Sequence, residues 1–444
     1  MKRLFYAILA FLGFAVFAAC GSGGEMPEVY ENRGEVEERA YLIFPTPDEP
    51  VANFPNEPQS WRDYHENNMP QPPADWTLPI RPSVIAAGNH ISAYIAEDGG
   101  LYVWGNLPFE EEIGEEYDYR RTPRRIMDDV VAIHTVVRHA TYMNDHLYAI
   151  NSQGELWRHR ATFYNGEPTG EYALELMFTD VTDFVHGHVF AALGTDGTAK
   201  ILNVSNRTSA LYVSMDYQSW GVLLQGYLQI GRLRALAVSG LTYGFFEVIE
   251  QWHLASTPAN SFHHFFGITY NGELWGWGAR TLDNVAFVSE GEGPVFSPIH
   301  IMDDVAQIAA ATQFQMALTN DGRLYTWGNS RGGELGHGNR SRITTPTFLM
   351  DNVAYIYARN GSALAVTTDG TLYIWGQMVN NSNTPQAFLN NVAAATFGEG
   401  HLLAVTNDGA LWGAGMNNAG QVDANNPNLN ISEMTRLFGG VMLP

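Results

Sequence analysis

The sequence predicts an all-β fold, a seven-bladed β-propeller preceded by a signal peptide and a disordered linker. Three observations predict it: a turn-and-strand pattern that recurs along most of the chain, a nearly constant spacing before each turn with a variable spacing after it, and an N-terminal region of different composition. At 444 residues the chain exceeds the usual size of a compact domain, so one large repeat architecture or two domains would fit.

The first residues have the composition of an export signal. Lys2 and Arg3 precede an apolar run, Leu4 to Phe17, that is too short for comfortable spanning of a bilayer. Phe17-Ala18-Ala19-Cys20 then resembles a bacterial lipobox, in which the cysteine is acylated and the leader is removed. We therefore predict a lipoprotein signal peptide over 1–19, lipidation at Cys20, and a location at the bacterial cell membrane or cell surface, on the extracytoplasmic face. The alternative is an ordinary cleaved signal peptide with an incidental cysteine.

The next stretch differs from the rest of the chain. Residues 20–80 are acidic and rich in proline, a composition that disfavours a packed core and favours an extended linker or stalk. A short strand or helix around Ala40 to Phe44, docked on the body, is the alternative. The repeat domain is assigned to residues 81–444.

The repeats share an Asp-Gly or Asn-Gly turn followed by alternating residues that end in Trp-Gly, as in Asp321 to Gly328. An alternating apolar run precedes each turn, and two such runs joined by a turn that favours positive φ indicate a β-hairpin. The anchors of these structural repeats are Gly99, Trp104, Gly154, Gly197, Gly272, Trp277, Gly322, Trp327, Gly370, Trp375 and Gly409.

The spacing around the anchors is asymmetric. A valine, usually after an Asp or Asn pair, begins a further apolar run, and it lies 16 or 17 residues before the turn glycine in four units and 24 in another. From the glycine to the next valine the distance varies from 22 to 33 residues. The constant half predicts a sheet packed in register, and the variable half predicts surface connections. Small sheets that cannot bury both faces alone would stack around an axis, which predicts the propeller.

One unit makes a family resemblance specific. The segment from Gln315 to Asn329, continuing through Gly332 to Gly338, resembles the repeat of the regulator-of-chromosome-condensation family. The resemblance implies a seven-bladed propeller and identifies the chain as a bacterial lipoprotein member of that family. Residues 202–251 fit the pattern least and are interpreted as an insertion, with a decayed extra blade as the alternative. Phe246 to Ile249 could then start the unit that ends at Gly272.

The end of the chain predicts how the ring closes. Glu433 to Gly440 resembles the opening strand of one more unit. A circular array can close by mixing strands from both termini in one blade, which avoids open sheet edges. We therefore expect Val84 and Leu437 to lie near the same seam.

Composition and motifs exclude several functions. The net charge of −23 disfavours nucleic-acid binding, and a single cysteine excludes an intrachain disulfide. Acidic pairs such as Asp128-Asp129 and Asp303-Asp304 suit strand-entry turns, and His90, His188 and His263 recur at one repeat position, which favours a structural role over metal binding. We predict no enzymatic activity and no catalytic, cofactor-binding or metal-binding residue.

These observations favour a non-enzymatic protein-interaction scaffold, lipid-anchored outside the cytoplasm and binding a partner through variable propeller loops. The membrane is contacted through the lipid anchor alone, the chain is expected to be a monomer, and the partner is an unknown protein or a cell-wall carbohydrate. Deleting 332–345 or 203–229 is predicted to weaken capture and to leave the fold intact. The alternative is a carbohydrate-binding or carbohydrate-hydrolysing propeller that uses axial carboxylates and exposed tryptophans.

Overall fold

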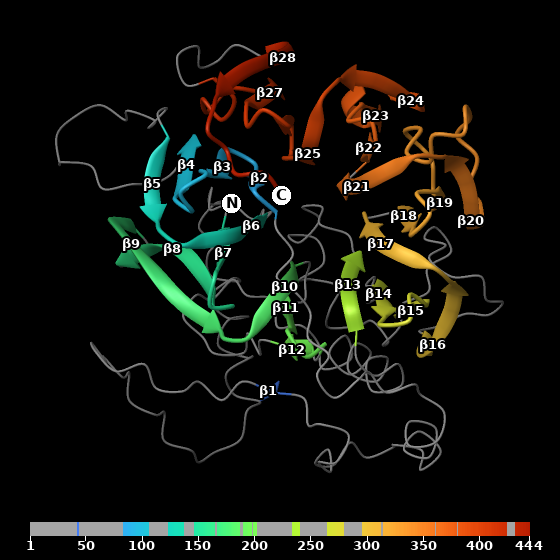
Figure 1. Cartoon of the computed structure of the whole chain (residues 1–444), viewed down its shortest axis with the longest axis horizontal. Helices are drawn as coiled ribbons and strands as arrows, with labels where there is room; N and C mark the ends of the chain where they lie inside the picture. The colour runs from blue at the N-terminus through green and yellow to red at the C-terminus, as the bar shows by residue number, and fades with distance from the viewer. Residues whose placement is uncertain are drawn as a thin grey trace, which may run out of the picture. The chain divides into compact units, whose positions relative to one another are not determined.

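Among the residues that it describes, the computed structural model shows seven four-stranded antiparallel sheets (Figure 1). It describes residues 42–43, 83–105, 123–136, 146–164, 167–186, 190–197, 199–201, 233–239, 264–278, 295–311, 314–359, 361–379, 381–423 and 431–444. The predicted signal peptide over 1–19 and Cys20 lie outside these residues. Within six of the sheets, hydrogen-bonded neighbours are also neighbours in the chain, so each of these sheets is a simple up-and-down meander.

The sheets are numbered from the first to the seventh in the order of their repeats along the chain. The first contains β2 (Ile85–Ala87), β3 (Ile91–Ile95), β4 (Leu101–Gly105) and β5 (Arg124–Met127). The second contains β6 (Val130–Val136), β7 (His146–Asn151), β8 (Leu156–Tyr164) and β9 (Glu167–Phe178). The third contains β10 (Val181–His186), β11 (Phe190–Gly194), β12 (Ala199–Ile201) and β1 (Leu42–Ile43). The fourth contains β13 (Leu233–Ser239), β14 (His264–Thr269), β15 (Leu274–Gly278) and β16 (Val295–Met302).

The last three sheets follow the same plan. The fifth contains β17 (Val305–Ala310), β18 (Phe314–Thr319), β19 (Leu324–Gly328) and β20 (Ile343–Met350). The sixth contains β21 (Val353–Arg359), β22 (Ser362–Thr367), β23 (Leu372–Gly376) and β24 (Ser382–Leu389), with the short 3-10 helix η2 (Gln377–Val379). The seventh contains β25 (Val392–Phe397), β26 (His401–Thr406), β27 (Leu411–Gly415) and β28 (Ile431–Phe438).

Position within a sheet sets the burial of each strand. Every residue of β18 is buried, since this strand has a neighbour on each side and a sheet over each face. Its sequence, FQMALT, is accordingly almost continuously apolar. The outer strand β20, ITTPTFLM, is half-buried or exposed throughout and carries Pro346, which suits an edge because proline has no amide to offer another strand.

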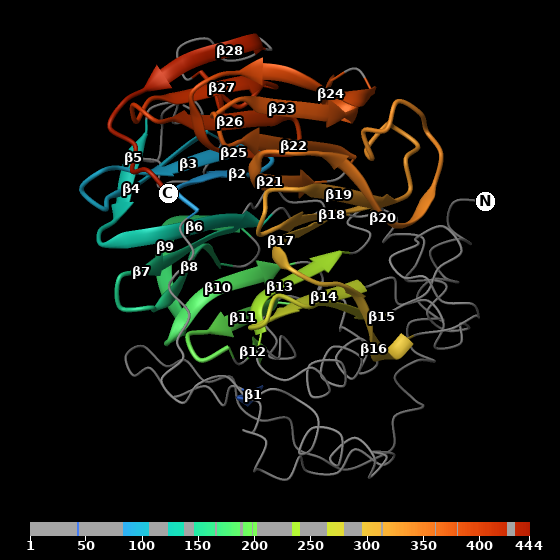
Figure 2. The ribbon, with the colours of Figure 1, turned by 45° about the vertical axis from the view of Figure 1, so that its right-hand side comes forward.

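The sheets form a closed ring. The first strand of each sheet contacts the preceding sheet, and β2 contacts both β6 and β25, so the seventh sheet returns to the first. Figures 1 and 2 both show β25 beside β2. Hydrophobic clusters fill the spaces between consecutive sheets: Trp327 of the fifth sheet, for example, packs in one cluster with Phe266 and Leu274 of the fourth. The arrangement is that of a seven-bladed propeller.

Closure joins the two ends of the repeat domain. Val441 pairs with Ala96, and the Met442 amide donates to the Ile95 carbonyl at 2.8 Å, so the last residues extend the line of β2 along β3. The Ile95 amide in turn donates to the Val84 carbonyl at 2.9 Å. Val84 and Val441 belong to one buried cluster against which Leu437 packs, which confirms the expected position of the seam.

Two details of strand order were predicted wrongly. Residues 433–440 were expected to open a further unit, but β28 is the fourth strand of the seventh sheet, and the opening position is taken by Val441 and Met442. The fourth sheet starts at β13, inside the proposed insertion 202–251, so that stretch is not a single loop. Phe246 to Ile249, the expected start, lies outside the described residues.

The third sheet takes its outer strand from far away in the chain. β12 is followed by residues 202–232, outside the description, and the fourth position is filled by β1, whose Leu42 and Ile43 pair with Ile201 and Lys200. The short-strand alternative for residues 40–44 is therefore the arrangement that the structure has. The other residues of the predicted linker, 20–80, lie outside the described residues.

Candidate functional site

The antiparallel sheets give the ring two different faces. Connections between the second and third strands, such as 320–323, and the two-residue links between sheets, such as 351–352, lie at one end of the strands, which we call the turn face. Connections between the first and second strands, such as 398–400, and between the third and fourth, such as 329–342, lie at the other end, which we call the loop face. The constant lengths belong to the turn face and the variable lengths to the loop face.

The predicted glycine anchors all lie on the turn face and have backbone roles. Each has a positive φ, between 72° and 88°, in the hairpin turn between the second and third strands. Its carbonyl accepts a hydrogen bond of 2.8 to 3.1 Å from the first residue of the next sheet. These pairs are Gly99 with Val130, Gly154 with Val181, Gly197 with Leu233, Gly272 with Val305, Gly322 with Val353, Gly370 with Val392, and Gly409 with Val441. The last pair is the closure.

The acidic pairs have a second backbone role on this face. The residue just before the opening valine has a left-handed backbone, with φ of 60° at Asp129, 59° at Asp304 and 63° at Asn391. Asp and Asn tolerate that conformation better than most residues, which explains the recurring pairs. Each pair links two consecutive sheets, so the pairs are distributed around the ring.

The turn carboxylates are also engaged locally. A hydrogen bond from the Thr367 hydroxyl, at 2.5 Å, holds the pKa of Asp369 below its usual value, and Thr319 does the same for Asp321. Ser152 likewise donates to the Asp129 carboxylate at 2.7 Å. These hydrogen bonds show that the carboxylates order the turns.

The tryptophan anchors pack between sheets. Trp104, Trp327 and Trp375 are fully buried, while the side chain of Trp277, on β15, lies outside the description. Trp375 Nε1 donates to the Glu334 carbonyl of the fifth sheet at 2.7 Å. Trp104 Nε1 occupies the corresponding position in the first sheet without a described hydrogen-bond partner, because Ser92 donates to the corresponding carbonyl, that of Gln421. The tryptophans therefore hold neighbouring sheets together.

The segment 329–338 proves to be structural. Leu335 and Glu334 are buried, Thr326 Oγ1 donates to the Leu335 carbonyl at 2.8 Å, and the Gly338 amide donates to Asn383 of the next sheet at 2.7 Å. The prediction that deletion of 332–345 leaves the fold intact is therefore wrong, because the deletion would remove part of the interface between two sheets.

One buried histidine near the seam has a structural role. His401 is fully buried, and its Nε2 lies 2.9 Å from Ser92 Oγ of the first sheet. Burial, with Arg359 nearby, lowers the pKa of His401 to about 3. His90 is half-buried, and His188 and His263 lie outside the described residues. Within the part of the chain that the structure describes, no group of histidines, cysteines and carboxylates could hold a metal ion.

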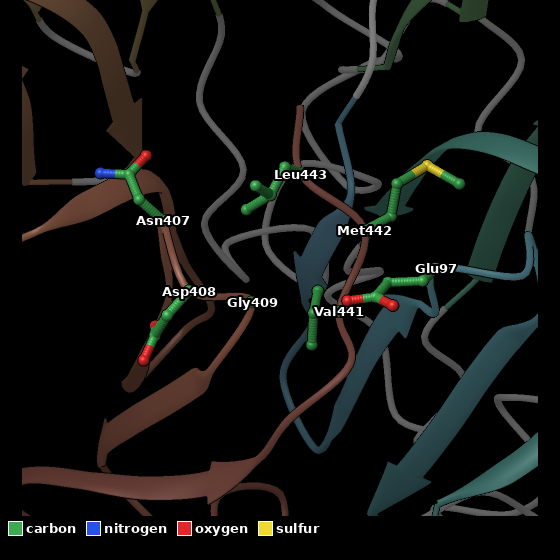
Figure 3. Close-up of a pocket in the computed structure, with 7 residues that line it drawn as sticks. All are labelled: Glu97, Asn407, Asp408, Gly409, Val441, Met442 and Leu443. Carbon is green, nitrogen blue, oxygen red and sulfur yellow. The ribbon is translucent and has the colours of Figure 1, made fainter.

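The described residues line a cavity at each end of the ring. One, of ≈ 410 Å³, is on the turn face at the seam, where Figure 3 shows Val441 between Gly409 and Glu97. Its backbone groups are used in closure: the Glu97 amide donates to the Gly440 carbonyl at 3.0 Å and the Val441 amide to Gly409 at 3.1 Å. The groups that line this cavity therefore serve to close the ring.

The other cavity, of ≈ 220 Å³, opens on the loop face between the sixth and seventh sheets. Arg359 and Glu399 line it as a largely buried ion pair with 3.4 Å between Nη2 and Oε1. Arg359 Nη1 also donates to the carbonyls of Ala87 and Phe397, at 3.0 and 3.2 Å, so it joins three sheets. Met378 and Gln377 complete the rim. No sequence signal identified this group, because its members come from three separate repeats.

Part of the chain is similar in sequence to known proteins. Residues 321–358 match the profile of the "Regulator of chromosome condensation (RCC1) repeat", a segment that runs from the hairpin turn of the fifth sheet into β21 of the sixth. Human "E3 ubiquitin-protein ligase HERC2" is 31% identical over 80 residues, 17% of this chain and 2% of that protein. "RCC1 domain-containing protein RUG3, mitochondrial" of Arabidopsis thaliana is 35% identical over 91 residues, 19% of this chain and 20% of that protein.

The chain is also similar to solved structures. The yeast RCC1 protein Prp20, bound to Kap60, aligns with a TM-score of 0.47 at 16% identity, covering 71% of this chain and 77% of that one. Human WBSCR16 aligns with a TM-score of 0.39 at 16% identity, covering 81% and 82%.

The seven sheets and their recurring turns define a repeat protein of the propeller class. The sequence match shows that residues 321–358, from the fifth into the sixth sheet, are similar to an RCC1 repeat. Among the described residues, no helix has the length and apolar character needed to cross a bilayer.

Proposed function

We propose that this protein is a non-enzymatic interaction scaffold that binds a partner protein through its loop face. The observation that carries the proposal is the division between the two faces. Turn-face connections are nearly constant in length and their backbone groups hold neighbouring sheets together, whereas loop-face connections differ widely in length, as the connections 360–361 and 329–342 do. Variable loops on a rigid frame are the usual location of binding residues, and the family fold is often used for protein binding.

We further propose that the scaffold is a monomer attached by lipid at Cys20 to the extracytoplasmic face of a bacterial membrane. The lipobox-like sequence before this cysteine supports that part of the proposal. A Cys20→Ser variant should lose incorporation of labelled fatty acid and should move from the membrane fraction to the soluble fraction. Equal fatty-acid labelling of the variant and the parent chain would refute the anchor.

Site-specific photo-crosslinking tests the binding face. A photoreactive residue is introduced on intact cells at Asn339 or Asn418, both exposed on the loop face, and at Thr368 or Asn407, both exposed on the turn face. The loop-face positions should crosslink to one defined protein, and the turn-face positions should not. Crosslinks formed only from Thr368 or Asn407 would contradict the proposal.

A further inference from the structure

The two faces of the ring differ in charge among the described residues. The turn face carries exposed carboxylates, offset in places by arginines such as Arg125 and Arg323. These carboxylates are Glu97, Asp98, Asp128, Asp129, Asp180, Asp303, Asp304, Asp321, Asp351, Asp369 and Asp408. On the loop face, the connection 329–342 instead exposes Arg331, Arg340 and Arg342, and its one carboxylate, Glu334, is buried. In a chain with a net charge of −23, this connection is a local basic surface.

The basic connection has an ordered backbone. Ser330 Oγ donates to the Asn339 carbonyl at 3.5 Å, so the chain folds back and brings the neighbouring residues Arg331 and Arg340 toward one end of the connection. The Ser341 amide donates to Asn339 Oδ1 at 2.9 Å, which fixes the turn between Arg340 and Arg342. The buried Glu334 accepts from the Gly332 amide at 2.7 Å. Because the backbone is held in this way, a ligand that binds the arginines orders little more than their side chains.

The basic connection continues into the loop-face cavity. Gln377, on the cavity rim, packs against Gly332, immediately after Arg331, and against Gly361 on the other side. Met416, 45% exposed, lies over Gly400 beyond Glu399. A basic edge, a polar cavity and the exposed Met416 thus lie near one another across the fifth to seventh sheets. Arginine and methionine are both enriched in protein interfaces.

We infer that the surface formed by Arg331, Arg340 and Arg342, together with the adjoining cavity edge at Gln377, binds an acidic polypeptide segment of the partner. This inference rests on the proposed function and specifies the partner's chemistry. The planar guanidinium group matches a carboxylate with two parallel hydrogen bonds, which suits aspartate and glutamate side chains. The strongly acidic remainder of the chain repels such a segment, so it is directed to this surface.

Binding of a fluorescein-labelled glutamate-rich peptide to the full chain tests the inference. The double variant Arg340→Ser/Arg342→Ser should bind the peptide about tenfold more weakly, as expected for the loss of two exposed charge pairs. Arg323→Ser is the matched control: it removes an exposed arginine of the same sheet, but on the turn face. This control should leave the affinity unchanged, and all chains should melt at nearly the same temperature because interactions of exposed arginines contribute little to stability.

Three results would overturn the inference: no peptide binding by the parent chain, equal weakening by the control, or binding of phosphatidylglycerol vesicles in place of the peptide. The last result would assign the arginines to an anionic lipid surface. Crosslinking distinguishes a failure of this inference from a failure of the proposed function. If crosslinking from Asn418 persists in the double variant while the peptide does not bind the parent chain, the scaffold function stands and the acidic partner is rejected.

Discussion

Two buried tryptophans at corresponding positions allow the contribution of one hydrogen bond between sheets to the free energy of unfolding to be measured. Trp375 and Trp104 are both fully buried, but Trp375 Nε1 donates to the Glu334 carbonyl at 2.7 Å, whereas Trp104 Nε1 has no described partner. Replacing either by phenylalanine removes similar packing. Only Trp375→Phe also leaves a buried carbonyl without its donor, which costs about 1–3 kcal/mol.

We therefore expect Trp375→Phe to lower the free energy of unfolding by about 1–2 kcal/mol more than Trp104→Phe does. Urea unfolding followed by far-UV circular dichroism measures this difference without relying on tryptophan emission. Equal losses, or a larger loss for Trp104→Phe, would refute the view that the tryptophan hydrogen bond joins neighbouring sheets.

The remaining predictions concern acid stability, closure and the turns. His401 has a pKa of about 3 in the folded chain, so its contribution to stability is complete above the ordinary histidine pKa and declines as the pH falls from about 6.5 toward 3. The His401→Gln variant should therefore show a flatter dependence of the urea unfolding midpoint on pH over that range. An unchanged slope would contradict this prediction. Removing 441–444 should lower the melting temperature by several degrees through the loss of closure, and an unaltered melting curve would argue against the seam. Gly440→Asn should be nearly neutral, since Gly440 has a φ of 74° and open space around it. Gly376→Asn should instead destabilise the fold by more than about 2 kcal/mol, because a Cβ there would overlap the Gly361 carbonyl. Similar melting temperatures for the two variants would refute the requirement for glycine at position 376.

Local features of the fold were readable from the sequence. The hairpin turns depend on glycines with positive φ such as Gly322, and the links between sheets depend on residues such as Asn352 that tolerate a left-handed backbone. Both signals are short-range, so they recur visibly in each repeat. The opening strand β13 was missed because Leu233 follows Arg232, without the acidic or amide pair that marks other units.

The candidate site depends on long-range topology, which the repeats do not encode locally. Arg359 meets Glu399 and the Ala87 carbonyl only after the ring closes. The glycine-rich segment after Gly328 looked like a free loop, yet its Leu335 is buried between sheets. The arginines Arg340 and Arg342 were visible as residues, but their contrast with the acidic turn face required the face assignment.

The division into a binding loop face and a structural turn face is tested most directly by methionine oxidation. Met416 is 45% exposed on the loop face, and Met442 is half-buried at the turn-face seam. Their oxidation rates are compared between intact cells and the purified chain. The two-face account predicts that Met416 oxidises several-fold more slowly on cells, because the partner covers it, while Met442 is unchanged. Protection of Met442 with no protection of Met416 would contradict it.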